Sequence, residues 1–372
     1  MRSGDTWREE RALRPQSTPV ARWPKGRARI KDRQLDDMTR QLATLLRAGV
    51  PLVQGLQTLA RSQGGDLGPV LDRLRRDIES GATLEQAMAR HPRVFDALYR
   101  SLVAAGELGG LLDTMLERIA DHRDKAGRLR SKVRSALVYP AAVLTVATLS
   151  VGVILAWVVP TFSAMFERSG AELPLPTQVV VAFSDALLGY GIWILLGGMA
   201  GCMGLARAMR RSPDLQRRAE VWLLRLPLLG RVLREAAAAR WCRTLGLLLA
   251  AGVPLTDALD TAARTAGQHR LADATQRIRR NTAAGQRLSP GMAESGCFPA
   301  VAVQMAHVGE ESGTLDSLLA KAAEGLERSV EDAVGQMTTL LEPAIMLVLG
   351  VVVGGVIISL YLPVFRLGAA VA

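Results

Sequence analysis

The sequence predicts an all-α integral membrane protein with two homologous cytoplasmic helical bundles and three transmembrane helices. The first observation is a long internal repeat: the pentapeptide Ala-Gly-Val-Pro-Leu occupies residues 48–52 and returns at 251–255, 203 residues later. The same offset relates Gly106-Glu107 to Gly309-Glu310, Leu112-Asp113 to Leu315-Asp316, Pro140 to Pro343, and Pro160-Thr161-Phe162 to Pro363-Val364-Phe365. So many residue types do not stay in register by chance, so the chain contains a duplication.

The second observation is three runs without Asp, Glu, Lys or Arg, at 135–166, 186–206 and 343–365. Each is longer than the roughly 18 to 20 residues that a helix needs to cross a bilayer core. They also explain the positive mean hydropathy of +0.17 in a chain with 46 Lys and Arg residues. We interpret them as membrane spans, with a deeply buried soluble helix as the alternative for the middle run.

The third observation is the distribution of basic residues, of which 26 lie in residues 1–134 and 18 in 207–342. By the positive-inside rule these two segments are cytoplasmic, whereas the loop at 161–178 and the C-terminus at 366–372 lie outside. The net charge of +11 therefore reports topology, with some attraction to anionic lipid. No aromatic-rich basic module accompanies the charge, which argues against nucleic-acid binding.

The remaining composition adds two points. The three cysteines, Cys202, Cys242 and Cys297, have no metal-type spacing, and we expect no disulfide among them. Residues 1–33 carry ten basic against four acidic residues and no helical periodicity, which predicts a basic disordered tail.

The first bundle is predicted over residues 34–134. Apolar residues recur at helical spacing from Leu35 to Leu46, and the corner follows directly. Gly49 supplies a left-handed residue after the helix, and Pro51 suits the first turn of the next one. The pentapeptide is therefore a helix-turn-helix corner, and we expect Gly49→Asp to disrupt the bundle.

The second bundle is predicted over residues 240–342 and repeats this plan with Gly252 and Pro254 at its corner. A later turn in each copy contains the Gly-Glu motif, at 106–110 and 309–313. No stretch alternates with period two for long enough to indicate a strand, so each copy is a bundle of roughly six helices or fewer.

Each bundle's last helix continues into a span, at 135–160 in the first copy and 343–365 in the second. Pro140 and Pro343 mark the same place near each entry, and we expect a kink there, so that bundle and span meet at an angle. Two units with the same orientation need one return crossing, which is the unmatched middle span at 179–206. A cytoplasmic linker at 207–239 then leads to the second bundle.

No enzyme signature occurs: the chain has no phosphate loop, no GxSxG elbow and no HExxH, and its four histidines are scattered. We therefore expect no catalysis and no cofactor. The strongest candidate site is the Gly-Glu turn with its carboxylates, Glu107, Asp113, Glu310, Glu311 and Asp316. Helix-dipole stabilisation is the first interpretation, with a divalent cation or a basic partner as the alternative.

Glycines in the spans form the other candidate. Gly350 and Gly354, and the glycines at 197, 198, 201 and 204, permit close contact between helices. Packing within the chain and packing against another protomer or a foreign helix both remain open.

The residues also resemble a known family. The run Arg40-Gln41-Leu42-Ala43-Thr44 before the first corner, the turn at Gly106-Glu107, Tyr139-Pro140 and the terminal Leu341-Glu342-Pro343 are similar to the inner-membrane platform proteins of type II secretion and type IV pilus systems. The resemblance covers about residues 33–372, and the pilus (PilC-like) branch looks closer than the secretion (GspF-like) branch. Residues 1–32 do not resemble the family's usual leader.

The resemblance implies a non-enzymatic platform in a bacterial inner membrane, with a periplasmic C-terminus. It implies contact with a hexameric assembly ATPase, with pilins or pseudopilins and with alignment proteins, and it implies a homo-oligomer. The filament served can be a pilus, a secretion pseudopilus or a DNA-uptake fibre. A transporter or permease and a membrane-bound enzyme are the alternatives from other classes.

Overall fold

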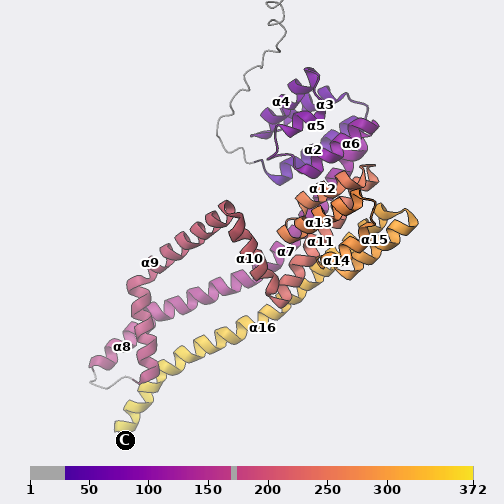
Figure 1. Ribbon diagram of the computed structural model, residues 1–372. Helices are drawn as coiled ribbons and strands as arrows, with labels where there is room; N and C mark the ends of the chain where they lie inside the picture. Colours follow the sequence, from indigo (N-terminus) through magenta and orange to yellow (C-terminus); the bar gives the residue numbers. More distant parts are fainter. Residues whose placement is uncertain (1–29, 169–173, 372) are drawn as a thin grey trace, which may run out of the picture.

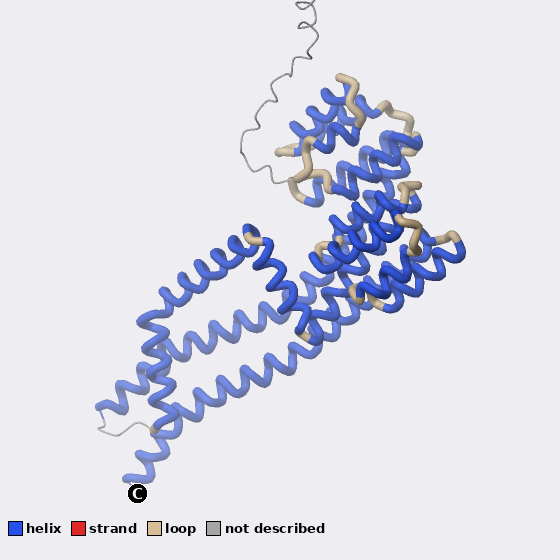
Figure 2. The backbone as a smooth tube through the Cα atoms, viewed as in Figure 1, coloured by secondary structure: helices blue, strands red, loops and turns tan. Residues whose placement is uncertain are grey.

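The computed structural model describes residues 30–168 and 174–371, and within those ranges every regular element is a helix. Two bundles lie at one end of the molecule, and long helices extend from them to the other end (Figure 1; Figure 2). The predicted all-α class is therefore confirmed. Most of the predicted N-terminal tail, residues 1–29, lies outside the described residues.

The first bundle is built from five short helices and the beginning of a long one. These are α2 (Asp32–Arg47), α3 (Leu52–Ser62), α4 (Leu67–Glu79), α5 (Leu84–Ala89), α6 (Ala97–Gly109) and α7 (Leu112–Val153). The apolar stripe predicted for the first helix is its buried face, with Leu35, Met38 and Leu42 at 0–4% exposure.

The second bundle has the same six-helix plan. Its helices are α11 (Pro227–Ala250), α12 (Leu255–Thr265), α13 (His269–Ala283), α14 (Leu288–Ser295), α15 (Ala300–Ser312) and α16 (Leu315–Val371). The cores of the two bundles form one continuous apolar cluster, and Ser101 of α6 hydrogen-bonds Thr261 of α12 (Oγ to Oγ1, 3.1 Å) across their boundary. The two bundles are therefore packed as one body.

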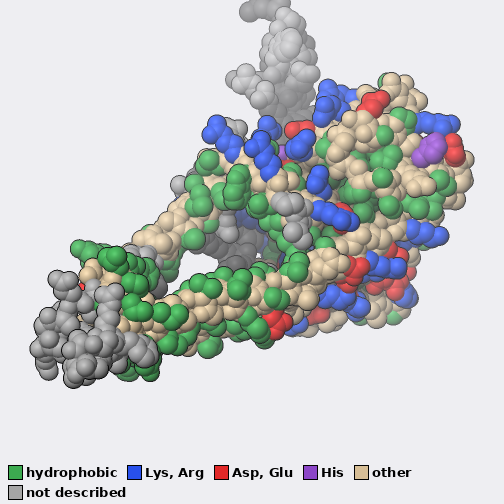
Figure 3. All heavy atoms as spheres, turned by 90° about the horizontal axis from the view of Figure 1, so that it is seen from below, with side chains coloured by type: hydrophobic (Ala, Val, Ile, Leu, Met, Phe, Trp, Pro, Cys, Tyr) green, Lys and Arg blue, Asp and Glu red, His purple; other side chains and the backbone are tan. Residues whose placement is uncertain are grey.

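Two helices join the bundles to the membrane-spanning part. Leu112–Ser163 and Leu315–Leu362 are each long and apolar enough to cross a bilayer. Hydrophobic side chains cover these arms, and charged side chains gather over the bundles (Figure 3). The first span runs through a short π-helical segment (Ile154–Val158) into α8 (Val159–Arg168). The predicted first and third spans therefore each lie in a helix able to cross a membrane.

The middle span has a different shape. Helix α9 (Leu175–Arg211) contains two segments, Leu175–Gly191 and Leu196–Met209, with a bend of 65° between them. Only together are the two segments long and apolar enough to cross a bilayer. Glycines flank the bend at 189, 191, 197 and 198, which is where a helix bends at least cost. The segment predicted as the return crossing is therefore a bent helix.

The structure adds helices to three segments that the sequence left without assigned elements. Helices α8 and α9 leave at most residues 169–174 for the outer loop, which was predicted at 161–178, and residues 169–173 of it are outside the described part. The expected linker at 207–239 is largely helical, since α10 (Pro213–Arg225) and the first half of α11 fill it. The expected C-terminal segment at 366–371 continues α16.

Candidate functional site

The repeated corners have the backbone geometry that the sequence predicts. Gly49 and Gly252 are left-handed, with φ of 81° and 79°. The amide of each glycine donates to the carbonyl three residues back (2.9 Å), and the next amide donates to a carbonyl five residues back (3.0 Å). This pair of bonds is the Schellman motif that closes a helix. Pro51 and Pro254 are the N-cap residues of α3 and α12. Each lies one residue before the first turn of the helix, the turn in which the sequence pattern placed it.

The Gly-Glu motif does not form a turn. Gly106 and Gly309 lie inside α6 and α15, and the left-handed turn residues are Gly110 (φ 66°) and Gly313 (φ 71°). A Cβ on Gly106 would lie 3.0 Å from Cα of Leu112, and one on Gly309 would be 2.8 Å from the equivalent backbone atom of the next helix. The two glycines therefore let α6 and α15 touch the backbones of α7 and α16.

The two motif glutamates cap helices that lie elsewhere in each bundle. Both carboxylate oxygens of Glu107 accept backbone amides at the start of α5, from Leu84 (2.5 Å) and Glu85 (2.9 Å). Glu310 does the same for α14, accepting the amides of Leu288 and Ser289 and also the Ser289 hydroxyl (2.6 Å). These amides have no partner within their own helix, and a negative charge there is favoured by the helix dipole.

The other candidate carboxylates are separate from these caps. Asp113 and Asp316 lie in the first turns of α7 and α16, as the dipole interpretation predicts. Glu311 pairs with Arg287 at 3.7 Å and lies 3.5 Å from His307. Among the residues that the structure describes, no group of three His, Cys, Asp or Glu side chains is placed to hold a metal ion. Glu107 and Glu310 are thus used in capping and Glu311 in an ion pair, as the first interpretation favours over a cation site.

A repeated ion pair was not recognised in the sequence. Arg40 of α2 pairs with Asp124 of α7, and Arg243 of α11 pairs with Glu327 of α16 (2.7 Å). Both members of the second pair stand 203 residues after those of the first. The spacing could have revealed it, since an Arg and an acid recur at the repeat offset. In each bundle the pair ties the first helix to the last.

The two motif prolines do not break their helices. Pro140 lies within α7, and the span that contains Pro343 is one helix from Leu315 to Leu362. Each helix therefore continues through its proline from bundle into span, and the kink expected there stays a prediction. Next to these prolines the Tyr139 hydroxyl donates to Glu342 (3.2 Å), so repeat-equivalent positions of the two helices meet where both enter the charge-free runs.

The same two helices are joined by ion pairs closer to the bundles. Lys125 lies 3.5 Å from Glu324, and Lys132 lies 2.7 Å from Glu331. Together with the tyrosine contact, these bonds hold α7 and α16 side by side on their way to the membrane.

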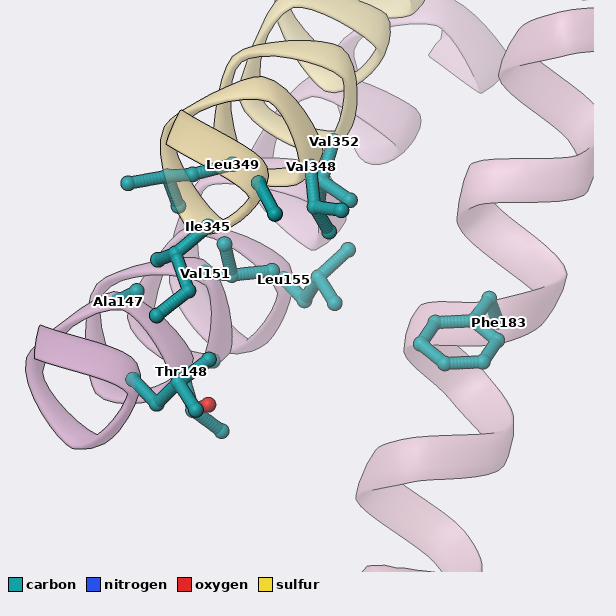
Figure 4. Close-up of a pocket in the computed structure, with 12 residues that line it drawn as sticks. Ala147, Thr148, Val151, Leu155, Phe183, Ile345, Val348, Leu349 and Val352 are labelled. Atoms are coloured by element: carbon teal, nitrogen blue, oxygen red, sulfur yellow. The ribbon is translucent and has the colours of Figure 1, made fainter. Parts of the chain in front are cut away.

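An apolar groove of about 600 Å³ lies between the spans. Leu155 of the π-helical segment and Val348 of α16 form its wall, and Phe183 of α9 faces it from across the gap (Figure 4). A Cβ added to Gly350 or Gly354 would have no atom within 4 Å. The same is true at glycines 197, 198, 201 and 204, so none of these six candidate glycines is a close-packing point among the described residues.

The buried polar groups of the spans are satisfied by backbone. The hydroxyl of Thr177 on α9 donates to the carbonyl of Ser359 on α16 (2.6 Å), and that of Ser184 donates to the carbonyl of Leu155. Leu155 lies in the π-helical segment, where the regular bonding ladder is displaced and carbonyls become available. These bonds join α9 to both other spans and form no polar path of their own.

These features define a class: a helical membrane protein whose duplicated bundle continues directly into a span. The family model for the type II secretion system (T2SS) protein F matches residues 38–160 and again residues 241–363, two segments that stand 203 residues apart. The chain belongs to this family, and each copy of the repeat is one family domain.

Named relatives come from both branches of the family. The chain is 41% identical to the type IV pilus assembly protein TapC of Aeromonas hydrophila, covering 92% of this chain and 84% of that one. It is 38% identical to the type IV pilus assembly protein PilC of Pseudomonas aeruginosa, with 92% of each chain covered. With the type II secretion system protein F of the same organism the identity is 33%, over 92% of this chain and 84% of the other.

Proposed function

We propose that this chain is the inner-membrane platform of a filament-assembly machine and performs no catalysis itself. The observation that carries the proposal is that both copies of a secretion and pilus family domain continue without interruption into membrane-spanning helices. The higher identity to pilus assembly proteins, 41% and 38% against 33%, favours a type IV pilus over a type II secretion system.

The proposed orientation places both bundles in the cytoplasm and the C-terminus in the periplasm. The basic residues of the two bundle segments support it through the positive-inside rule. Arg90→Cys in the first bundle and Leu175→Cys at the start of α9, each in a cysteine-free background, provide the test. A membrane-impermeant maleimide should label position 175 in intact spheroplasts and position 90 only after lysis. The reverse pattern would contradict the orientation.

The proposed partners are a hexameric assembly ATPase on the cytoplasmic side, pilins or pseudopilins in the membrane, alignment proteins and further copies of this chain. The groove between the spans and the uncovered glycines of α9 and α16 support helical partners in the membrane. Since the sequence has no nucleotide site, the energy for assembly would come from the ATPase.

Helices α7 and α16 would carry the coupling. A force applied to a bundle reaches the span through one unbroken helix, and the contacts at Lys125, Lys132 and Tyr139 make the two helices move together. A long helix braced in this way transmits displacement better than a flexible linker does.

Softening α7 tests the coupling. Arg128 and Ser131 are exposed between the first bundle and its span. Arg128→Gly with Ser131→Gly should weaken the helix by about 2 kcal/mol and reduce filament assembly strongly in cells lacking the chromosomal copy. Arg128→Ala with Ser131→Ala removes the same groups, keeps the helix stiff and should assemble normally. Normal assembly by the glycine variant, at equal protein level, would contradict the coupling proposal.

A further inference from the structure

The strongest unassigned feature is a cleft of about 540 Å³ lined by α7, α11 and α16. These helices come together at the foot of the bundles (Figure 1). Its α7 wall ends at Arg134, and the charge-free run of the first span begins at the next residue. If that run crosses the bilayer, the cleft opens at the level of the lipid head groups of the cytoplasmic leaflet.

Positive charge predominates in this cleft. Five Lys or Arg residues line it (Lys125, Arg130, Arg134, Arg240 and Arg243), against one acidic residue, Glu327. Glu327 is occupied by Arg243 through two hydrogen bonds of 2.7 and 3.2 Å. Lys125 and Arg130 pair with acids outside the lining, Glu324 at 3.5 Å and Asp32 at 2.9 Å.

Two guanidinium groups remain without a carboxylate. Within the described part of the chain, no acidic group lies in ion-pair range of Arg134 or Arg240, and the Nη2 of Arg240 donates only to the carbonyl of Ala266 (3.2 Å). Both side chains are exposed enough to reach a ligand. Partial desolvation by the cleft walls, with the like charge of Arg130, lowers the pKa of Arg240. Uncompensated cations of this kind favour an anionic ligand.

The repeat does not require these cations. The positions equivalent to Arg130, Arg134 and Arg240, 203 residues away, are Ala333, Met337 and Asp37. The basic cleft is therefore a feature of one place in the molecule and not part of the duplicated frame.

The remaining walls are apolar and include Leu129 and Val133 of α7, Val232 of α11, and Val330 and Val334 of α16. A soluble anion would gain nothing from these side chains, whereas an amphiphile would bury alkyl groups against them. Basic pockets on the cytoplasmic side of spanning helices suit anionic lipid head groups.

We propose that this cleft binds an anionic phospholipid of the cytoplasmic leaflet, with its phosphate between Arg134 and Arg240. Such a lipid would join α7, from the first repeat, to α11, from the second. The choice of leaflet rests on the proposed orientation, whereas lipid binding itself does not depend on the platform function and can be measured without any filament.

The experiment uses the full chain purified in a neutral detergent. Phosphatidylglycerol or cardiolipin is added, and thermal unfolding and retained lipid in native mass spectrometry are measured; phosphatidylcholine, inorganic phosphate and a nucleoside diphosphate are tested in parallel. The anionic lipids should raise Tm by about 5 °C, and the other three should not. The shift should shrink in high salt.

The double variant Arg134→Gln with Arg240→Gln should lose most of the lipid-induced rise in Tm. Arg277→Gln with Arg280→Gln, on the exposed side of α13, removes the same charge elsewhere and should keep it. Arg134→Gln alone serves if the double variant unfolds. An equal shift in wild type and cleft variants would overturn the proposal. A shift produced by phosphate or nucleotide alone would overturn the lipid assignment.

Discussion

Phe95 in the first bundle and Phe298 in the second occupy equivalent positions, yet each ring meets a different partner. Phe95 packs edge to face on Tyr99, four residues later in the chain (centroids 5.1 Å apart). Phe298 packs on Trp241 of α11 (4.6 Å). The residue equivalent to Trp241 is Met38, and the one equivalent to Tyr99 is Ala302, so a large side chain has moved from one helix to another.

Each large ring brings its own polar partner. The Tyr99 hydroxyl hydrogen-bonds Thr39 (3.0 Å), and burial raises the pKa of Tyr99 to about 12. Trp241 donates from Nε1 to Thr275 (2.9 Å), while the position equivalent to Thr39 holds Cys242. The duplicated frame of corners, caps and glycines is thus constant, whereas the aromatic packing within it differs between the bundles.

Transplanting the first core into the second bundle is the most severe test of this comparison. Trp241→Met alone should cost about 2 to 3 kcal/mol, less than truncation to Ala would, because it leaves a smaller cavity beside Phe298. Adding Ala302→Tyr and Cys242→Thr rebuilds the other arrangement and should recover at least about 1 kcal/mol. Thermal unfolding of the full chain in detergent measures both. If the triple variant is less stable than Trp241→Met alone, the core arrangement of the first bundle cannot replace that of the second.

The repeated ion pairs differ in burial and should differ in energy. The Arg243 side chain is 8% exposed and that of Arg40 is 57% exposed. Arg243→Met should therefore cost about 3 kcal/mol, since Glu327 keeps a poorly solvated charge, whereas Arg40→Met should cost less than about 1 kcal/mol. Arg243→Met with Glu327→Leu should recover most of the loss. Equal losses at positions 40 and 243, in lipid-free detergent, would refute this explanation.

The glutamate caps should contribute in both bundles, and more in the second. Glu310 accepts three hydrogen bonds and Glu107 accepts two. We expect losses of about 3 and about 2 kcal/mol for Glu310→Ala and Glu107→Ala, measured by thermal unfolding. Glu294→Ala, at an exposed position of α14, is the control and should be nearly neutral. A Glu310→Ala variant as stable as this control would exclude the capping role.

Protonation of His122 should destabilise the first bundle in mild acid. Burial, with Arg243, Arg123 and Lys125 nearby and Asp96 opposing, lowers the pKa of His122 to about 4. The unfolded chain takes up this proton near pH 6.5 and the folded chain does not, so stability falls as the pH drops through this window. The expected loss is about 2 kcal/mol at pH 5 relative to pH 7.5.

The equivalent position in the second bundle is Gly325, so only the first bundle contains this imidazole. His122→Gln removes the titrating group and should therefore remove this part of the pH dependence of stability. Unfolding midpoints measured from pH 7.5 to 5 provide the comparison. An unchanged slope in the variant would assign the effect to other groups.

The repeat made much of the architecture predictable from sequence. The corner glycines, the six-helix bundles and two of the spans follow from periodicity, turn chemistry and charge. The capping role of Glu107 could not be predicted, because its partners are backbone amides of α5, more than twenty residues earlier in the chain. No local sequence pattern encodes such a tertiary contact. Pro140 marks the entry into the span as expected, and α7 continues through it, because a proline removes only one backbone bond of a long helix.

The corner glycines should show a small effect and no difference between the two bundles. A Cβ on Gly49 or Gly252 would meet no atom within 4 Å, so only the left-handed backbone opposes a side chain. Gly→Ala should cost about 1 to 2 kcal/mol at each site, and Gly→Asn less. Gly49→Asp should therefore be tolerated, which revises the disruption expected from sequence.

Gly64→Ala is the matched control, because that position is equally open and its φ is not positive. Thermal unfolding should rank Gly64→Ala above Gly49→Ala and Gly252→Ala, with the last two alike. Filament assembly should continue in all three, because the corner shapes the bundle without contacting a partner. Loss of assembly in Gly49→Ala at unchanged stability would instead mean that a partner binds the corner directly.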